Sequence, residues 1–414
     1  MLKYGGAVIH MLKNSEQITV LCGIMPENSS NIYPMPVFSE EVCSFLHQLS
    51  SMLMNHPESR MFPDILTFGF FCRRANINRL KSQYNGNIEN RLGRGITFHI
   101  APSNVPVNFA YSMAVGLLAG NACIIKVSSK PFPQTDIVCS CINELLAKKE
   151  NHFLNNYISV VRYPNEAAIN DAVSSICDVR IIWGGDNTIS EIRKSPLPSR
   201  ATEITFADRY SVAVFDAEAV LNADTSFARD FYNDTYLYDQ NACSSPHLIY
   251  WLGEKDVCDR AGQYFWNTVH DYIKSIYHLS PVLAVDKYTA ACRLAISQKT
   301  EIVSMPDMLI SRARIYELSE DIEKYRCAGG SFTEYYDTTL DALEKTVSRK
   351  TQTISYFGDI GETLREYVTG HHLTGVDRIV PVGRTADFDV HWDGYDLILQ
   401  LSRYIALQKK GMNR

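Results

Sequence analysis

One cysteine of this chain stands in a segment that suits nucleophilic chemistry. Cys243 lies in Asp239-Gln-Asn-Ala-Cys-Ser-Ser-Pro246, a polar stretch that precedes an apolar run. A thiolate is a strong nucleophile that forms thioesters readily, and an irregular loop leaves its sulfur accessible. The chain has 11 cysteines, however, so residue type by itself does not select Cys243.

A lysine and a glycine pair stand where a nucleotide could bind. Lys126 ends an apolar run, so its ammonium either reaches solvent along its own stem or binds ribose hydroxyls or a phosphate. Gly184 and Gly185 follow the predicted strand Val179–Trp183 and precede a helix, whose first backbone amides can face a phosphate. Glycine also serves such turns for geometry alone. Both features therefore leave a structural explanation open beside a nucleotide site.

Two histidine segments are candidates for chemistry or for metal binding. His391 and Asp393 could join a cysteine, as in thiol hydrolases and acyltransferases, or form a plain polar turn around Gly394. His371-His372 has no third ligand at metal spacing, and the cysteines lack the paired spacing of a zinc site or a disulfide framework. The sequence therefore predicts no metal site and a chain with reduced cysteines.

Strand and helix patterns alternate between residues 96 and 206. The pattern predicts strands at Ile96–Ala101, Ala122–Val127, Tyr157–Arg162, Val179–Trp183 and Ala201–Phe206, and helices at Asn108–Ala119, Pro133–Leu146 and Glu166–Ile176. Such alternation favours a doubly wound parallel sheet, which binds ligands at the carboxyl ends of its strands. The loop of Asn104, the Ser128 region and the Gly184-Gly185 turn all fall at those ends.

The pattern changes after about residue 207. Helices at Phe227–Tyr238 and Val257–Ile276 flank the Cys243 loop and a strand at His247–Leu252. The sequence thus predicts an N-terminal region with a nucleotide-binding domain over 1–206 and a catalytic domain over 207–374. The segment 375–414 is expected to return to the nucleotide-binding domain and to close with a helix over Leu397–Leu407. Residues 1–60 show no motif.

Composition excludes several classes of protein. The 414 residues are 46% hydrophobic and 21% charged, which is typical of a soluble globular protein. The net charge of −6 gives no electrostatic reason to expect nucleic acid. No apolar run approaches the roughly 18–20 residues of a membrane span, and Met1–His10 lacks the layout of a signal peptide. A cytoplasmic location is therefore expected.

The chain resembles the LuxC-type acyl-CoA reductases, a family within the aldehyde dehydrogenase superfamily. The likeness runs from about residue 90 to the C-terminus and rests on His99-Ile-Ala-Pro-Ser-Asn-Val-Pro, Gly120-Asn-Ala-Cys-Ile-Ile-Lys-Val-Ser-Ser129, Asp239-Gln-Asn-Ala-Cys-Ser-Ser-Pro246, Lys350-Thr-Gln-Thr353, Gly375-Val-Asp-Arg-Ile-Val-Pro-Val-Gly383 and His391-Trp-Asp-Gly394. The resemblance implies an α/β, aldehyde dehydrogenase-like fold: a Rossmann-type parallel sheet for the cofactor and a second α/β catalytic domain. It also implies NADPH-dependent reduction of an acyl thioester, carried by CoA or by a protein, to an aldehyde.

The resemblance assigns roles to individual residues. Cys243 would take the acyl group from the thioester donor. The Asn104 side-chain amide and the Cys243 backbone N–H would form the oxyanion hole. Lys126 would bind the adenosine ribose, and Gly184 and Gly185 would form the turn before the helix that faces the nucleotide.

Two departures from ordinary aldehyde dehydrogenases bear on the reaction. Those enzymes activate water with a glutamate, whereas Thr205-Phe-Ala-Asp-Arg209 stands at the matching place, with Glu203 two residues away. Without that base, the acyl-cysteine is spared hydrolysis.

Relatives that prefer NAD often carry a glutamate three residues after the lysine, whereas this chain has Ser129, after Ser128 and before Lys130. Serine and lysine tolerate or attract a 2′-phosphate, so NADPH is expected, with NADH as the alternative.

The sequence leaves two alternatives to the reductase open. A cysteine-dependent acyltransferase or thioesterase would use Cys243 with His391 and consume no nicotinamide. A catalytically silent subunit of an acyl-transfer complex would bind nucleotide or acyl group without turnover. The expected partners are the thioester substrate, a protein that transfers acyl groups and a second copy of the chain.

Overall fold

The computed structural model describes residues 17–26, 32–304 and 306–408. The chain divides into two compact units, the first formed by Met1–Ala207 with Phe388–Arg414 and the second by Asp208–Asp387. The N-terminal stretch Met1–His10, which bears on the signal-peptide prediction, lies outside the described residues.

The first unit is built on a six-stranded sheet. Its order across the sheet is β1 (Thr19–Gly23), β5 (Ile158–Arg162), β4 (Ala122–Lys126), β3 (Ile96–Ile100), β6 (Val179–Trp183) and β7 (Thr202–Phe206). Strands β3 to β7 are parallel, as the alternating pattern predicts, whereas β1 pairs antiparallel with β5. The chain adds strands to one side of β3 and then returns to add β6 on the other side, which is the arrangement of a doubly wound sheet.

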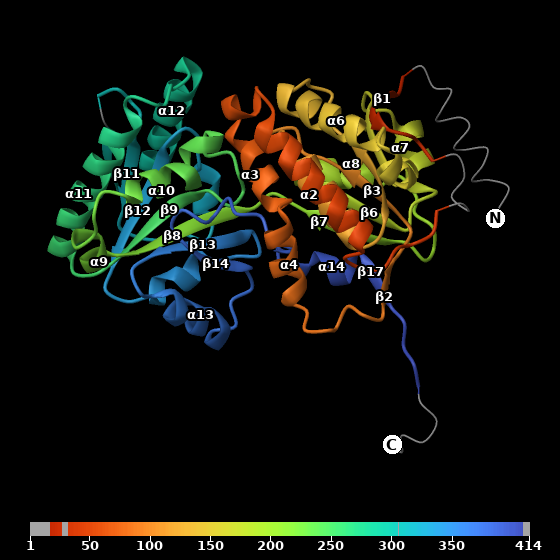
Figure 1. Cartoon of the computed structure of the whole chain (residues 1–414). Coiled ribbons are helices and arrows are strands. Elements are labelled where there is room, and N and C mark those ends of the chain that lie inside the picture. Colours follow the sequence, from red (N-terminus) through yellow and green to blue (C-terminus); the bar gives the residue numbers. More distant parts are fainter. Residues whose placement is uncertain (1–16, 27–31, 305, 409–414) are drawn as a thin grey trace. The chain divides into compact units, whose positions relative to one another are not determined.

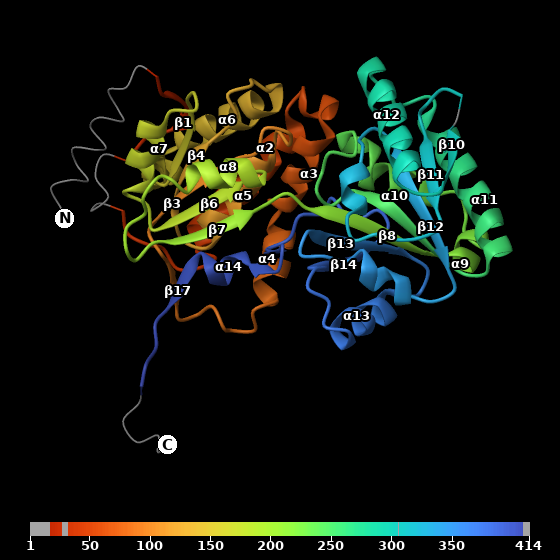
Figure 2. The ribbon, with the colours of Figure 1, turned by 180° about the vertical axis from the view of Figure 1, so that it is seen from behind.

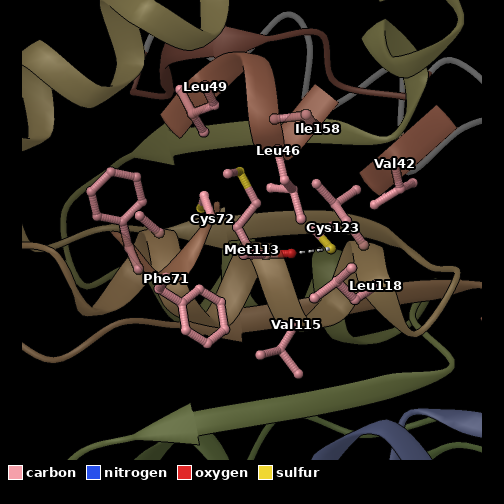
Figure 3. Packing of buried hydrophobic residues seen from close by; sticks show 14 of the residues in the cluster. Val42, Leu46, Leu49, Phe71, Cys72, Met113, Val115, Leu118, Cys123 and Ile158 are labelled. Atoms are coloured by element: carbon pink, nitrogen blue, oxygen red, sulfur yellow. Dashed lines mark hydrogen bonds between the residues drawn. The ribbon is translucent and has the colours of Figure 1, made fainter. Parts of the chain in front are cut away.

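Helices cover both faces of this sheet (Figures 1 and 2). One face packs against α2 (Glu40–Asn55), α3 (Pro63–Phe71), α4 (Arg74–Ser82), α5 (Asn108–Leu118) and α6 (Pro133–Leu146). The other face packs against α7 (Ala167–Ser174) and α8 (Asp186–Ile192). Figure 3 shows the first of these cores, where Leu46 of α2 lies beside Met113 of α5. Residues 1–60, which gave no sequence signal, thus supply a strand and a core helix.

The second unit contains a seven-stranded sheet. Its order is β10 (Thr300–Ser304), β11 (Ser311–Ile315), β12 (Ser331–Asp337), β9 (Pro246–Leu252), β8 (Tyr210–Asp216), β13 (Thr351–Phe357) and β14 (Arg378–Pro381). Only β10 runs antiparallel to its neighbour among these seven strands. The helices of this unit are α9 (Ala217–Leu221), α10 (Phe227–Asp234), α11 (Lys255–Ile273), α12 (Pro281–Ser297) and α13 (Gly361–Gly370).

Alternate residues of the central strand β8 enter two separate cores. Ala213 and Phe215 pack in the core that includes residues of α10 and α11. Val212 and Val214 pack on the other face, in the core that includes Leu294 of α12 and Leu364 of α13. Successive strand residues point to opposite faces, so an apolar run such as this one is buried on both sides.

The C-terminal segment differs from the sequence prediction in two ways. The boundary at 374/375 is wrong, because β14 pairs with β13 and keeps residues 375–387 in the second unit. The closing helix over Leu397–Leu407 is also wrong: α14 ends at Gln400 (Leu397–Gln400) and β17 (Ser402–Tyr404) follows. Strand β17 pairs with β2 (Arg91–Gly93), and the guanidinium of Arg91 donates to Leu399 O at 2.8 Å, so edge pairing replaces the helix.

Candidate active site

The carboxyl edge of the first sheet gathers most of the residues predicted to bind a nucleotide. Strand β3 pairs with β4 on one side, where Ile100 lies opposite Lys126, and with β6 on the other. The loop that carries Asn104 follows β3, and the Gly184-Gly185 turn follows β6. The strand order reverses between β3 and β6, and ligands of doubly wound sheets bind at such a switch point.

Lys126 stands half-buried at the end of β4. Its Nζ lies 4.9 Å from the ring centre of Tyr163, a buried residue whose hydroxyl donates to Asn170 Oδ1 at 2.9 Å. Burial lowers the pKa of Lys126. Within the described part of the chain no ion pair holds this ammonium, so an anionic or polyhydroxylated ligand would find it available.

The segment after β4 is organised by its own hydroxyls. Ser128 Oγ accepts from Lys130 N at 3.1 Å, and Ser129 Oγ donates to Tyr163 O at 3.4 Å. Lys130 is exposed, with Nζ 5.1 Å from the ring centre of Phe132. Ser129, three residues after Lys126, is thus followed directly by an exposed ammonium.

The Gly184-Gly185 turn leads into the short helix α8. A Cβ on Gly184 would lie 3.1 Å from Thr188 Cγ2, so this glycine serves close packing. A Cβ on Gly185 would meet no atom within 4 Å, so the backbone there is open to approach. Asp186 brings a carboxylate into the first turn of the same helix, at the end that favours negative charge.

Glu203, two residues before Thr205, is held in an ion-pair network. Its Oε2 accepts from Arg180 Nε at 2.8 Å and its Oε1 accepts from Arg193 Nε at 2.7 Å. Arg180 is 2% exposed and lies opposite Glu203 on the neighbouring strand. The carboxylate thus neutralises a buried guanidinium, which is a structural role.

Cys243 differs from the other cysteines in exposure. Of the eleven cysteines, all within the described ranges, eight are buried, Cys292 and Cys327 are intermediate, and Cys243 is exposed. Cys123 illustrates the buried group: in Figure 3 its thiol points to Met113 O, 3.7 Å away. Burial raises the pKa of Cys123 to about 12, which keeps that thiol protonated and unreactive.

A strained and braced loop presents Cys243. Asp239 and Gln240 both have positive φ, 51° and 60°. The buried Gln240 amide ties the loop down: Nε2 donates to Pro246 O at 2.9 Å, and Oε1 accepts from Gly330 N at 2.9 Å. Backbone strain of this kind persists where the surroundings fix it and is common at functional sites.

Cys243 also contacts strand β8, which pairs with β9, and strand β13, which pairs with β8. Ser211 Oγ, at the start of β8, donates to Cys243 O at 2.7 Å. Gln352 Nε2, at the start of β13, lies 3.3 Å from Cys243 Sγ. No role was predicted for Ser211, Gln240 or Gln352. A signal existed for the two glutamines, because Gln240 lies in Asp239-Gln-Asn-Ala-Cys-Ser-Ser-Pro246 and Gln352 in Lys350-Thr-Gln-Thr353, two of the shared motifs.

His391 lies in the first unit, in the short strand β15 (His391–Trp392). It is exposed, its ring stacks on Tyr84 with centres 6.3 Å apart, and Nε2 lies 3.3 Å from Asp396 Oδ2. These contacts orient the imidazole within its own unit, and its part in cysteine chemistry remains a prediction.

Residues 17–26, 32–304 and 306–408 contain no group of three or more His, Cys, Asp or Glu side chains placed to hold a metal ion. They also contain no helix long and apolar enough to cross a membrane.

Comparison with protein families and sequences gives one consistent result. The model of the acyl-CoA reductase (LuxC) family matches residues 38–404. A long-chain acyl-protein thioester reductase of Photorhabdus laumondii is 26% identical over 325 residues, which cover 76% of this chain and 64% of that protein. The long-chain acyl-protein thioester reductase 2 of Photobacterium leiognathi is 32% identical over 166 residues, 39% of this chain and 33% of that protein. The match with the first relative thus spans less than two thirds of its length.

Solved structures with the same fold are aldehyde dehydrogenases. A NAD-dependent benzaldehyde dehydrogenase of Corynebacterium glutamicum superposes with a TM-score of 0.60 over 94% of each chain, at 13% identity. A lactaldehyde dehydrogenase superposes with a TM-score of 0.61 over 91% of this chain and 87% of that one, at 12% identity. The predicted aldehyde dehydrogenase-like architecture is therefore confirmed.

Proposed function

Because the chain belongs to the acyl-CoA reductase (LuxC) family, we propose that it reduces an acyl thioester to an aldehyde through an acyl group carried on Cys243. The observation that supports this most is the exposure of Cys243, the one exposed thiol among eleven described cysteines. The names of the relatives support a long-chain acyl group, delivered as a thioester on a protein.

In the first step the Cys243 thiolate attacks the thioester carbonyl. The new C–S bond forms first and gives a tetrahedral oxyanion; when this oxyanion collapses, the bond to the donor sulfur breaks and the donor leaves as a thiolate, which takes a proton from water. The negative charge on the carbonyl oxygen would be stabilised by the Asn104 amide and the Cys243 backbone N–H. One such donor contributes roughly 2.7–4 kcal/mol of transition-state stabilisation in enzymes that use an oxyanion hole.

The second step needs a hydride, which a bound nicotinamide dinucleotide supplies. The half-buried Lys126 ammonium and the open backbone at Gly185 are compatible with such a ligand at the carboxyl edge of the first sheet. Lys126 would bind the ribose, Gly184 and Gly185 the phosphates, and Ser128, Ser129 and Lys130 the adenosine side, with NADPH preferred.

Release of the aldehyde completes the cycle. The thiohemiacetal on Cys243 loses its C–S bond, which frees the aldehyde and regenerates the thiolate. Thr205 stands where oxidising relatives have a glutamate, and Glu203 is engaged by Arg180 and Arg193. No carboxylate is therefore proposed to activate water against the acyl-cysteine.

The test uses acyl-CoAs of increasing chain length and an acyl-protein thioester. We expect mass spectrometry to find the acyl group on Cys243 without nicotinamide, and added NADPH to be oxidised with release of aldehyde. Thioester turnover with no NADPH oxidation would instead support the hydrolase or acyltransferase that uses Cys243 and His391. Binding of acyl group or nucleotide without turnover would support the silent subunit.

Cofactor choice has its own test. We expect kcat/KM with NADPH to exceed that with NADH, and Lys130→Glu to reduce the ratio about tenfold, because a carboxylate repels the 2′-phosphate. An unchanged ratio would contradict this assignment. The homo-oligomer and the cytoplasmic location stay predictions.

A further inference from the structure

Strand β13 begins with an unusual run of buried polar residues. Gln352 and Thr353 are 0% exposed, and Thr351 and Ser355 are 1% exposed. Polar side chains are rarely buried so completely, and each requires hydrogen bonds to offset the loss of water. The shared motif Lys350-Thr-Gln-Thr353 covers the start of this run, and the reaction proposed above uses none of its residues.

A bulge interrupts the pairing at the start of this run. The pairing of β13 with β8 shifts register between Thr351 and Ile354, where an extra residue enters β13. Bulges re-aim side chains and are frequent beside active sites. Thr353 N donates to Ser211 Oγ at 3.2 Å, and Ser211 Oγ donates to Cys243 O at 2.7 Å, so the bulge and the cysteine loop are joined through one hydroxyl.

The Gln352 side chain lies between a hydroxyl and the cysteine. Its Oε1 accepts from Thr353 Oγ1 at 3.3 Å. Its amide nitrogen lies 3.3 Å from Cys243 Sγ. The backbone is held as well, because Asp377 N donates to Gln352 O at 2.8 Å. The donor is thus positioned before any substrate binds.

We infer that Gln352 is a catalytic residue whose amide N–H donates to the Cys243 sulfur and stabilises it as the thiolate. A hydrogen bond to a charged acceptor is stronger than one to a neutral acceptor, so this contact favours the attacking form. A neutral amide carries no charge to repel an acyl donor, and it neither gains nor loses a proton over the working pH range. The inference rests on the proposed role of Cys243 as nucleophile.

The test is the rate of Cys243 alkylation by iodoacetamide in the substrate-free full chain, with the labelled site identified by mass spectrometry. For Gln352→Leu we expect a rate about ten to a hundred times lower at pH 7. The pH of half-maximal alkylation should rise by about one unit or more. Ser355→Ala is the matched control, because Ser355 lies on the same strand, is equally buried, and its hydroxyl has no hydrogen-bond partner among the described residues. That control should label like the parent chain.

Gln352→Glu keeps the size of the side chain and is used if the leucine variant does not fold, as judged by circular dichroism. It places a carboxylate beside the sulfur, so alkylation should slow at least as much. If a folded variant of Gln352 labels at the parental rate and pH, the inference is wrong, whatever the fate of the acyl transfer. If the parent chain labels at Cys243 but is never acylated by a thioester, the proposed function fails instead.

Discussion

The two sheets of this chain carry their candidate site residues at opposite ends of their strands. In the first unit, the Asn104 loop, Lys126 and the Gly184-Gly185 turn follow the carboxyl ends of β3, β4 and β6. In the second unit, Cys243 precedes β9, and Ser211 and Gln352 stand at the amino ends of β8 and β13. One sheet follows the rule that ligands bind at carboxyl ends, and the other does not.

The difference separates binding from covalent chemistry. The carboxyl edge offers loops, hydroxyls and a half-buried ammonium, which suit an extended anionic ligand. The amino edge offers a bulge, two residues with positive φ and a buried polar cluster around one exposed sulfur. A nucleophile needs a fixed position and donors to its charge, so local strain and buried amides matter more there than the direction of the strands.

Loss of the nucleophile tests the comparison most strongly. For Cys243→Ala we expect acyl labelling to vanish and thioester-dependent NADPH oxidation to fall by more than about a thousandfold, because no other exposed thiol can carry the acyl group. Binding of NADPH, measured by fluorescence titration, should be unchanged. Substantial NADPH oxidation in this variant would mean that the hydride acceptor is not an acyl group on Cys243 at the amino edge.

Thiol labelling across pH compares the exposed cysteine of the amino edge with buried cysteines in the core of the first unit, without any substitution. Burial raises the pKa of Cys123 to about 12 and that of Cys141 to about 11, so both stay protonated and unreactive at pH 8. We expect iodoacetamide at pH 8 to modify Cys243 at least about a thousandfold faster than either, with the buried thiols gaining reactivity only as pH rises toward their pKa values. Peptide mapping after timed quenching measures the rates. Equal labelling would show that the first core opens readily.

Substitution of Asn104 tests whether nucleotide binding at the carboxyl edge and covalent chemistry at the amino edge are separate. It belongs to the carboxyl-edge loop, yet its amide is proposed to act on an oxyanion formed at Cys243. For Asn104→Ala we expect kcat to fall about a hundred to a thousandfold, the usual cost of losing one oxyanion donor. Gln134→Ala, another amide of the first unit, is the control. If only the affinity for NADPH changes, Asn104 acts in the nucleotide site and not in the oxyanion hole.

Much of the first unit was readable in the sequence because its signals are local. Continuous apolar runs such as Ala122–Val127 mark strands buried on both faces, and they match β4 closely. The helix predicted over Leu397–Leu407 was wrong, because the apolar residues of this segment suit a helix and a strand equally well. The structure of this segment depends on a distant partner, because β17 pairs with β2, which lies about 300 residues earlier in the chain. The edge strand β1 likewise depends on pairing with β5 rather than on its own pattern.

The candidate site was readable only in part, for the same physical reason. Cys243 was found from its polar loop and shared motif, and exposure then separated it from ten similar residues. Gln352 stands 109 residues after Cys243, and its contact with the sulfur depends on a bulge that no local pattern announces. Contacts of this kind follow from strand pairing and register, which a single sequence does not specify.

Substitution of Lys126 is expected to have the smallest effect. It also distinguishes most sharply between the role of the carboxyl edge in nucleotide binding and that of the amino edge in acyl transfer. Its ammonium lies 4.9 Å from the centre of the Tyr163 ring, and no ion pair within the described part of the chain competes for it. For Lys126→Ala we expect the Kd for NADPH to rise about tenfold, the usual range for one charged contact. Acylation of Cys243 in the absence of nicotinamide should proceed at the parental rate. Lys194→Ala is the control, because Lys194 is exposed on the same unit and paired with Glu191. If Lys126→Ala slows acylation and spares NADPH binding, the carboxyl edge serves the cysteine, and the division between the two edges is wrong.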